Sequence, residues 1–130
     1  MRSLTITLLL FVAAIAAPVA RSSEVPYDAT AFATALKSGA PMAVVFHADW
    51  CPTCRAQAPI LEELSREPKF KGVTVFIADF DKELALRQQL RVNRQSTIVV
   101  FNKGQERKRS TGETQREGLA AVLSAVGDGI

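Results

Sequence analysis

The sequence predicts an α/β domain whose central mixed sheet of about four strands carries helices on both faces. Three apolar runs at residues 42–46, 73–78 and 97–101 are typical of strands and alternate with helical segments. The helix expected between the first two runs implies that those strands are parallel. Asn102-Lys103-Gly104 then forms a turn into a polar strand at residues 106–110, which is the pattern of an antiparallel hairpin. The sheet is therefore expected to be mixed.

Composition limits the chain to one compact domain. It has 130 residues, 48% hydrophobic and 22% charged, with two cysteines. These values exclude a long multidomain enzyme, a disordered chain and a small disulfide scaffold. The net charge of +3 is too small to indicate a partner nucleic acid. Nothing in the sequence requires more than a monomer.

The first segment has the features of a secretory signal peptide. Arg2 gives a positive start, residues 4–17 are almost entirely apolar, and Ala14-Ile15-Ala16 has the small residues of a cleavage site. We expect residues 1–20 to be removed, after Ala16 or Ala20, leaving an exported, periplasmic domain at residues 21–130. An uncleaved membrane anchor is less favoured, because the apolar run is shorter than the roughly 20 residues of a spanning helix.

The mature part should begin with a linker at residues 21–27 and a short helix at residues 28–37. Phe32 and Leu36 lie four apart, Asp28 can cap the first turn and Gly39 can end the helix. A second helix should start near Cys51, with an apolar stripe and an internal bend; these features come from Ile60, Leu61, Leu64 and Pro59.

Two further helices complete the pattern. Residues 82–90 should form a third helix capped by Asp81. The sequence from Thr114 to Glu117 fits a capping box ahead of a last helix. The apolar face of that helix is Leu119, Val122, Leu123 and Val126.

The two cysteines form a C-x-x-C motif, Trp50-Cys51-Pro52-Thr53-Cys54, where a buried strand meets a helix. In an exported chain without further cysteines this motif favours a redox pair over a four-ligand zinc site. Cys51 at the helix start lies near unpaired N–H groups that favour its thiolate, and Cys54 is one turn further. Cys54 can therefore attack a mixed disulfide formed at Cys51. A purely structural disulfide is disfavoured, since so short a loop removes little unfolded-state entropy.

The whole mature chain, from about Tyr27, resembles the thioredoxin family. The matching residues are Phe46, Ala48, Trp50, Cys51, Cys54, Pro59, Asp81, Thr97, Phe101, Gly104 and Gly112. The stretch from His47 to Cys51 is also similar to the C-terminal domain of DsbD-type thiol:disulfide interchange proteins. The resemblance implies the thioredoxin fold.

The resemblance also implies dithiol/disulfide exchange on protein substrates, with Cys51 as nucleophile and Cys54 as resolving thiol. The contact surface would be Trp50, Pro52, Thr53, Ser96 and Thr97, with the Ser96 backbone pairing to an extended substrate segment. No cofactor is implied, and electrons would come from a membrane electron-donor protein. We favour a reductase, because the interval from Cys54 to Ser96 has no room for the helical insertion of the envelope oxidants. The cysteines also enclose no histidine.

The main departure from the family is Ser96, which stands where thioredoxins have a cis-proline. A cis bond before a residue other than proline costs roughly 2.5 to 4 kcal/mol, so we expect a trans bond. The loop would gain an N–H and a hydroxyl beside the sulfurs. Ser96 would then donate to the Cys51 thiolate, admit a metal ion, or simply fill the loop.

Two further departures lie on one strand. Val45 aligns with the buried aspartate that thioredoxins use to relay the proton of the second cysteine, and His47 lies two positions along, on the same face. His47, the only histidine, would assist proton transfer at Cys54 or would be a packing residue beside Trp50.

Two rival functions remain open. The first is a metal-binding or metal-delivery module using Cys51, Cys54 and His47, although three ligands are one short of a closed zinc site. The second is a binding domain with little turnover.

Overall fold

A computed structural model describes residues 23–127 of the chain. The predicted signal peptide, residues 1–20, lies outside the described residues. Among residues 23–127, no helix is both long enough and apolar enough to cross a membrane.

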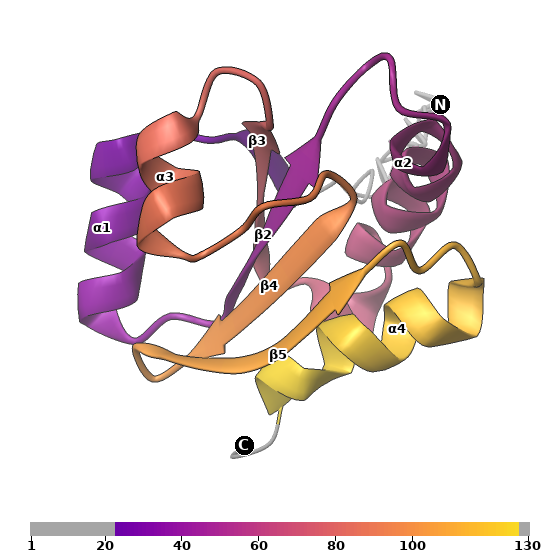
Figure 1. Cartoon of the computed structure of the whole chain (residues 1–130). Coiled ribbons are helices and arrows are strands. Elements are labelled where there is room, and N and C mark those ends of the chain that lie inside the picture. The colour runs from indigo at the N-terminus through magenta and orange to yellow at the C-terminus, as the bar shows by residue number, and fades with distance from the viewer. Residues whose placement is uncertain (1–22, 128–130) are drawn as a thin grey trace, which may run out of the picture.

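The centre of the molecule is one five-stranded mixed sheet in the order β1-β3-β2-β4-β5 (Figure 1). The strands are β1 (Glu24–Pro26), β2 (Met42–His47), β3 (Thr74–Asp79), β4 (Thr97–Asn102) and β5 (Gln105–Thr111). β1 and β2 pair with β3 in parallel, whereas β4 is antiparallel to both β2 and β5. The predicted mixed sheet is confirmed, with β1 as a strand beyond the four expected.

The extra strand β1 corrects the expectation of a linker at residues 21–27. It has only three residues and ends at Pro26, so it carries no readable alternation. Its strand conformation comes from pairing with β3, where Glu24 lies opposite Val75. The next residue, Tyr27, continues the pairing by donating its N–H to the Ile77 carbonyl at 2.9 Å.

Helices cover both faces of the sheet, as predicted. In Figure 1, α1 (Ala29–Ser38) and α3 (Leu84–Gln89) lie on one side, and α2 (Pro52–Ser65) and α4 (Arg116–Ser124) lie on the other. The first layer packs through Phe32 and Leu86, and the second through Leu61 and Leu119. Short 3₁₀ turns follow α2 and α4 at Pro68–Phe70 and Ala125–Gly127.

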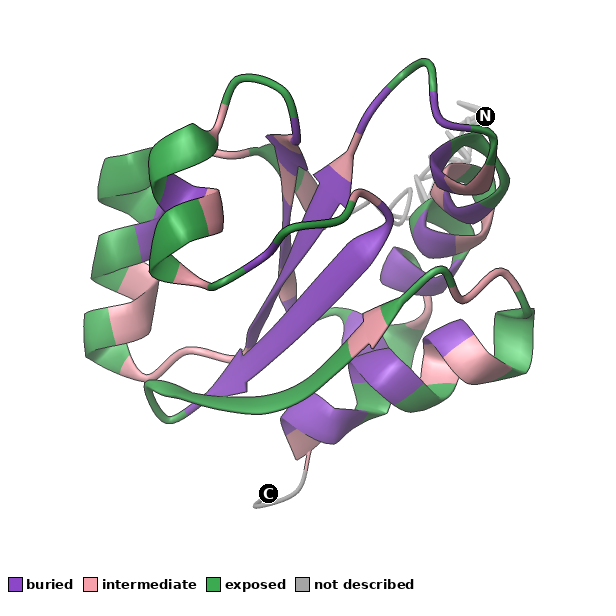
Figure 2. Cartoon of the chain, in the orientation of Figure 1, coloured by how far each residue is buried: buried purple, intermediate pink, exposed green. Residues whose placement is uncertain are grey.

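The strand that leads to the cysteines, β2, is buried along nearly its whole length. Met42 to Phe46 of β2 are all buried, and Figure 2 shows β2 and β4 as the continuous buried centre. A strand flanked by others and covered on both faces must be apolar throughout, which explains the unbroken run. β2 therefore gives the residues at its C-terminal end a rigid base.

The helix caps confirm two predictions, both for α1, and contradict two others. The Asp28 carboxylate accepts the Ala31 N–H at 2.7 Å, and Gly39 ends α1 with a φ of 76°. The predicted cap by Asp81 is wrong: α3 starts two residues later than expected, after Glu83, with no side-chain cap. The predicted capping box is also wrong, because α4 starts at Arg116 and the Glu113 carboxylate accepts the Gln115 N–H instead.

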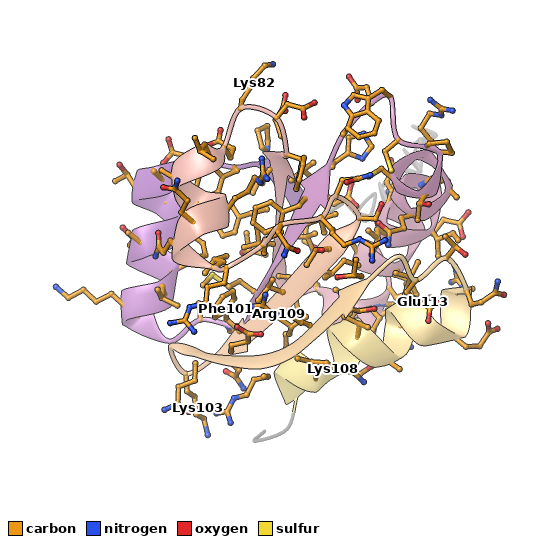
Figure 3. The ribbon with its side chains drawn as sticks, in the orientation of Figure 1. Lys82, Phe101, Lys103, Lys108, Arg109 and Glu113 are labelled. Carbon is orange, nitrogen blue, oxygen red and sulfur yellow. The ribbon has the colours of Figure 1, made fainter. Side chains whose placement is uncertain are left out.

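The predicted hairpin is present, and its turn uses positive φ angles at Lys103 (54°) and Gly104 (73°). The polar strand β5 is almost wholly exposed. Figure 3 shows Lys103 at the turn and Lys108 and Arg109 along this outer strand. Arg109 is paired with Glu106 at 2.7 Å. Such a charged edge discourages pairing with the strands of other chains.

Candidate active site

The two cysteines lie at the junction between β2 and α2. After β2 the chain turns, and the Cys51 N–H donates to the Ala48 carbonyl at 3.0 Å. Cys51 is the N-cap residue of α2, and Pro52 occupies the first helical position, where its missing N–H has no cost. Cys54 follows one turn later. Both side chains are free thiols and both residues are buried.

Cys51 is surrounded by hydrogen-bond donors. Its Sγ lies 3.3 Å from Ser96 Oγ and 3.4 Å from the Cys54 N–H. Burial opposes ionisation, but the bonds from Ser96 and from the N–H groups of Cys54 and Thr53 lower the pKa of the Cys51 thiol to about 7. A substantial fraction of Cys51 is therefore the nucleophilic thiolate at neutral pH.

Cys54 has the opposite character. It is 1% exposed, and its Sγ lies 3.0 Å from Ser96 Oγ. Burial raises the pKa of the Cys54 thiol, and proximity to Cys51 raises it further. Cys54 therefore holds its proton at neutral pH. The pair is divided into an ionisable nucleophile and a protonated, sheltered thiol.

Ser96 connects the two sulfurs. Its peptide bond is trans, as expected, and its φ of 60° lies in the left-handed region that few side chains adopt. The side-chain hydroxyl is within hydrogen-bond distance of both cysteines. Among the three predicted roles of Ser96, the structure realises the hydrogen bond to Cys51 and adds one to Cys54.

The backbone of Ser96 corrects another expectation. Its N–H donates to the Phe46 carbonyl at 2.9 Å, and its own carbonyl accepts the Gly112 N–H at 3.0 Å. Both groups are used within the protein, so the Ser96 backbone does not offer the expected pairing to an extended substrate segment. The N–H likewise points to β2 and not to the sulfurs.

Gln57 is a site residue that sequence reasoning missed. It is 1% exposed on α2, and its Nε2 donates to the carbonyls of Ser96 at 3.3 Å and Glu113 at 2.7 Å. These bonds fix the Ser96 loop against α2. The sequence offered one signal for this role: Gln57 is a polar residue on the inner face of a predicted amphipathic helix.

The exposed rim of the site is smaller than predicted. Trp50 is 58% exposed, and its indole N–H donates to the Asp81 carboxylate at 2.7 Å. Pro52 is exposed and Thr53 is half-buried. Ser96 and Thr97 are buried, and the Thr97 hydroxyl is bonded to Arg94 and Thr111. Trp50, Pro52 and Thr53 are therefore the predicted contact residues that a partner can reach.

His47 lies near Cys54 but is oriented by another residue. Its Nε2 is 3.0 Å from a carboxylate oxygen of Asp49, and its side chain is 23% exposed. His47 and Cys54 line one cavity. Among residues 23–127, no three His, Cys, Asp or Glu side chains are placed to hold a metal ion together. The structure thus gives the metal-module alternative no ligand set within the described chain.

The fold and the paired thiols define a dithiol oxidoreductase. A family model for thioredoxin matches residues 23–125, nearly the whole described chain. The chain belongs to the thioredoxin family and is a thiol:disulfide oxidoreductase.

Curated relatives agree with this assignment. Thioredoxin of Mycobacterium tuberculosis is 33% identical over 109 residues, covering 83% of this chain and 90% of the relative. The bifunctional thioredoxin reductase/thioredoxin of Mycobacterium leprae is 36% identical over 101 residues. That match covers 78% of this chain but only 21% of the bifunctional protein.

Solved structures show the same fold. The crystal structure of Trxlp from Edwardsiella tarda EIB202 has 43% identity and a TM-score of 0.74, covering 77% of this chain and 96% of that one. Thioredoxin of Malassezia sympodialis has the same TM-score at 22% identity, covering 85% and 96%, and supports the fold alone. The similarity to DsbD-type domains stays a prediction.

Proposed function

We propose that this protein is an exported reductase of protein disulfides that works through a mixed disulfide at Cys51. The Cys51 thiolate attacks a substrate disulfide, one substrate thiolate leaves, and Cys54 then attacks Cys51 Sγ to release the second. Substrate disulfide is reduced to two thiols, and the Cys51/Cys54 pair is oxidised to a disulfide.

The observation that carries this proposal is the division of the two thiols around Ser96. The pKa of Cys51, about 7, is close to the value of about 7 in thioredoxin and well above the value of about 3.5 in the strong oxidant DsbA. A strongly stabilised thiolate favours the reduced pair and makes an oxidant. The Cys51 thiolate is only moderately stabilised in this protein, which supports a role as a reductant of substrate disulfides.

The mechanism is tested by trapping. Cys54→Ser should accumulate a covalent complex between Cys51 and a disulfide-bonded substrate protein, visible on non-reducing gels and released by dithiothreitol. Cys51→Ser is the matched control and should form no such complex. Equal trapping by both variants contradicts the assignment of nucleophile and resolving thiol.

The direction is tested by equilibrating the pair with glutathione. We expect a potential near the reducing end, about −270 mV, whereas a value near about −120 mV reverses the direction. Repeating the titration with zinc tests the metal module, which predicts a large zinc-dependent shift.

Export and the electron source belong to the same proposal. Residues 1–20 have the signal-peptide pattern, so mature protein isolated from cells should begin at residue 17 or 21, as N-terminal sequencing can determine. A mature chain starting at Met1 contradicts cleavage. We also propose that the protein is a monomer and that a membrane electron-donor protein reduces it.

A further inference from the structure

The Ser96 hydroxyl lies between the two sulfurs, where it can donate to either but not to both. Ser96 Oγ is 3.3 Å from Cys51 Sγ and 3.0 Å from Cys54 Sγ. A hydroxyl has one proton, which turns about the Cβ–Oγ bond and is donated in one direction at a time. The hydrogen bond can therefore change from one sulfur to the other by movement of this proton, without displacement of the side chain.

The surrounding backbone holds Ser96 in this position against strain. Its φ of 60° lies in the left-handed region, which is unfavourable for residues other than glycine. Its N–H donates to the Phe46 carbonyl at 2.9 Å. Its carbonyl accepts from the Gly112 N–H at 3.0 Å and from Gln57 Nε2 at 3.3 Å. A strained conformation that is fixed by several bonds is typical of functional sites, and here it places a hydroxyl beside both reacting atoms.

The negative charge that this hydroxyl can stabilise changes place during the reaction. In the reduced protein the anion is the Cys51 thiolate. When Cys51 attacks a substrate disulfide, its sulfur bonds to one substrate sulfur and becomes neutral, and the other substrate sulfur leaves with the electron pair. The next anion that the reaction needs is the Cys54 thiolate, because a thiolate and not a thiol attacks a disulfide.

Cys54 needs a hydrogen-bond donor in order to ionise. Burial has the largest effect on its thiol and raises the pKa, whereas the Ser96 hydroxyl and the Ala48 N–H lower the pKa. The Phe46 carbonyl oxygen lies 3.9 Å from Cys54 Sγ, where it accepts from a thiol but repels a thiolate. Once Cys51 is neutral, the Ser96 O–H has no anion on that side and can turn to the Cys54 sulfur.

We propose that Ser96 is a catalytic residue whose hydroxyl donates to the Cys51 thiolate in the reduced protein and to the Cys54 thiolate in the mixed disulfide. The proposal rests on the mixed-disulfide mechanism proposed above. In the resolving step the Cys54 proton goes to solvent and the Cys54 thiolate attacks Cys51 Sγ. The intramolecular disulfide forms, the bond between Cys51 and the substrate breaks, and the substrate sulfur leaves with the electron pair. The Ser96 hydroxyl keeps its own proton throughout.

A stable analogue of the mixed disulfide tests the second position of the hydroxyl. Iodoacetamide caps the more ionised Cys51 as a neutral thioether, and Cys54 is then the only thiol. The ultraviolet absorbance of the thiolate, followed against pH, gives the Cys54 pKa. We expect this pKa to be about 1 to 2 pH units higher in capped Ser96→Ala than in capped wild type, because a hydrogen bond to an anion is lost. His47 and Glu24, which line one cavity with Cys54, are the same in both proteins, so the difference isolates the hydroxyl.

The rate of resolution tests the same hydrogen bond in the reaction itself. Reduced full-length protein is mixed in a stopped-flow instrument with excess 5,5′-dithiobis(2-nitrobenzoate). Attack by Cys51 releases a first coloured thiolate at a rate that depends on the reagent concentration, and resolution by Cys54 releases a second at a rate that does not. Ser96→Ala should slow the second release about threefold to fifteenfold at neutral pH, because the smaller thiolate fraction is partly offset by greater nucleophilicity. Above the pKa of Cys54 the slowing should vanish, whereas a merely displaced sulfur would stay slow at every pH.

Two further variants separate the hydroxyl from the backbone. Ser96→Gly removes the hydroxyl and relieves the positive φ, so it should match Ser96→Ala in both measurements. Ser38→Ala removes a hydroxyl that donates to the Ala35 carbonyl on α1, and it should change neither measurement. An equal Cys54 pKa in capped wild type and capped Ser96→Ala, or slowing that persists at high pH, overturns the role of Ser96. A wild type that releases only one coloured thiolate overturns the mixed-disulfide mechanism itself, so the two failures are distinguishable.

Discussion

At the scale of single residues, the Ser96 hydroxyl is within hydrogen-bond distance of two sulfurs, one ionised and one protonated. Ser96 Oγ is 3.3 Å from Cys51 and 3.0 Å from Cys54, yet a hydroxyl has only one proton to donate. With Cys51 ionised and Cys54 protonated, Ser96 donates to the Cys51 thiolate and accepts from the Cys54 S–H. This arrangement satisfies all three groups and is lost if either thiol changes its state.

Ser96→Ala should therefore raise the pKa of Cys51 from about 7 toward the ordinary thiol value. A hydrogen bond to a charged group contributes about 1.5–3 kcal/mol, which corresponds to a pKa rise of about one to two units. The pH dependence of iodoacetamide alkylation, followed by mass spectrometry at Cys51, measures the shift.

Ser124→Ala is the matched control for this substitution. Its hydroxyl donates to the Ala120 carbonyl on α4 and has no contact with a sulfur. It should leave the alkylation profile of Cys51 unchanged. An unchanged profile in Ser96→Ala would mean that the helix N-terminus alone sets the Cys51 pKa.

At the scale of elements, Gln57 ties α2 to two loops that are far away in the sequence. One bond reaches the turn before β4 and the other the turn before α4. Ser96 keeps a second donor in the Gly112 N–H, so the Glu113 carbonyl depends more on Gln57. Glu113 lies in the loop that leads into α4 (Figure 3).

Gln57→Leu should lower the free energy of unfolding by about 1–3 kcal/mol, because the partly buried Glu113 carbonyl loses its bond to Gln57. Urea denaturation of the reduced protein measures this loss. Gln88→Leu on the exposed surface of α3 changes the same chemical group and should cost far less. Equal losses in the two variants would contradict a structural role of the Gln57 bonds.

The sequence predicted elements well wherever packing follows a regular period. Apolar runs located β2, β3 and β4 to within one residue at each end, because central strands covered on both faces must be continuously hydrophobic. Capping was less predictable. Asp81 is a residue type that often caps helices, but its carboxylate accepts a hydrogen bond from the indole of Trp50, which is distant in sequence. β1 was not predicted, because its strand conformation comes from pairing with β3 and not from a pattern in its own residues.

The candidate site was only half predictable. Cys51 and Cys54 are recognisable from spacing, and the neighbourhood of Ser96 from the family resemblance. Gln57 acts through bonds to the Ser96 and Glu113 carbonyls, which come near it only when α2 packs on the sheet. The positions of residues along the chain do not show which of them become neighbours in the fold.

At the scale of the whole molecule, the shifted thiols link folding stability to pH. The pKa of Cys51 is lower in the folded chain than its ordinary value of 9.0, so the folded state binds fewer protons. The contribution of Cys51 to stability is therefore complete above pH 9 and is lost as the pH falls through about 7. The raised pKa of Cys54 has the opposite effect, which begins only above its ordinary value.

The reduced protein should accordingly become more stable between pH 7 and pH 9, measured as the midpoint of urea unfolding. The Cys51→Ser variant lacks the ionising thiol and should show a flatter profile over the same interval. Parallel profiles of the two proteins would contradict a lowered Cys51 pKa.

The chain has a single tryptophan, and that residue stands beside the nucleophilic sulfur with its indole held by Asp81. The fluorescence of the protein therefore originates mainly at the reactive edge of the molecule. Oxidation, docking of a partner and covalent capture each alter the surroundings of this one fluorophore. Every step of the catalytic cycle can be followed through Trp50 emission without attaching a label.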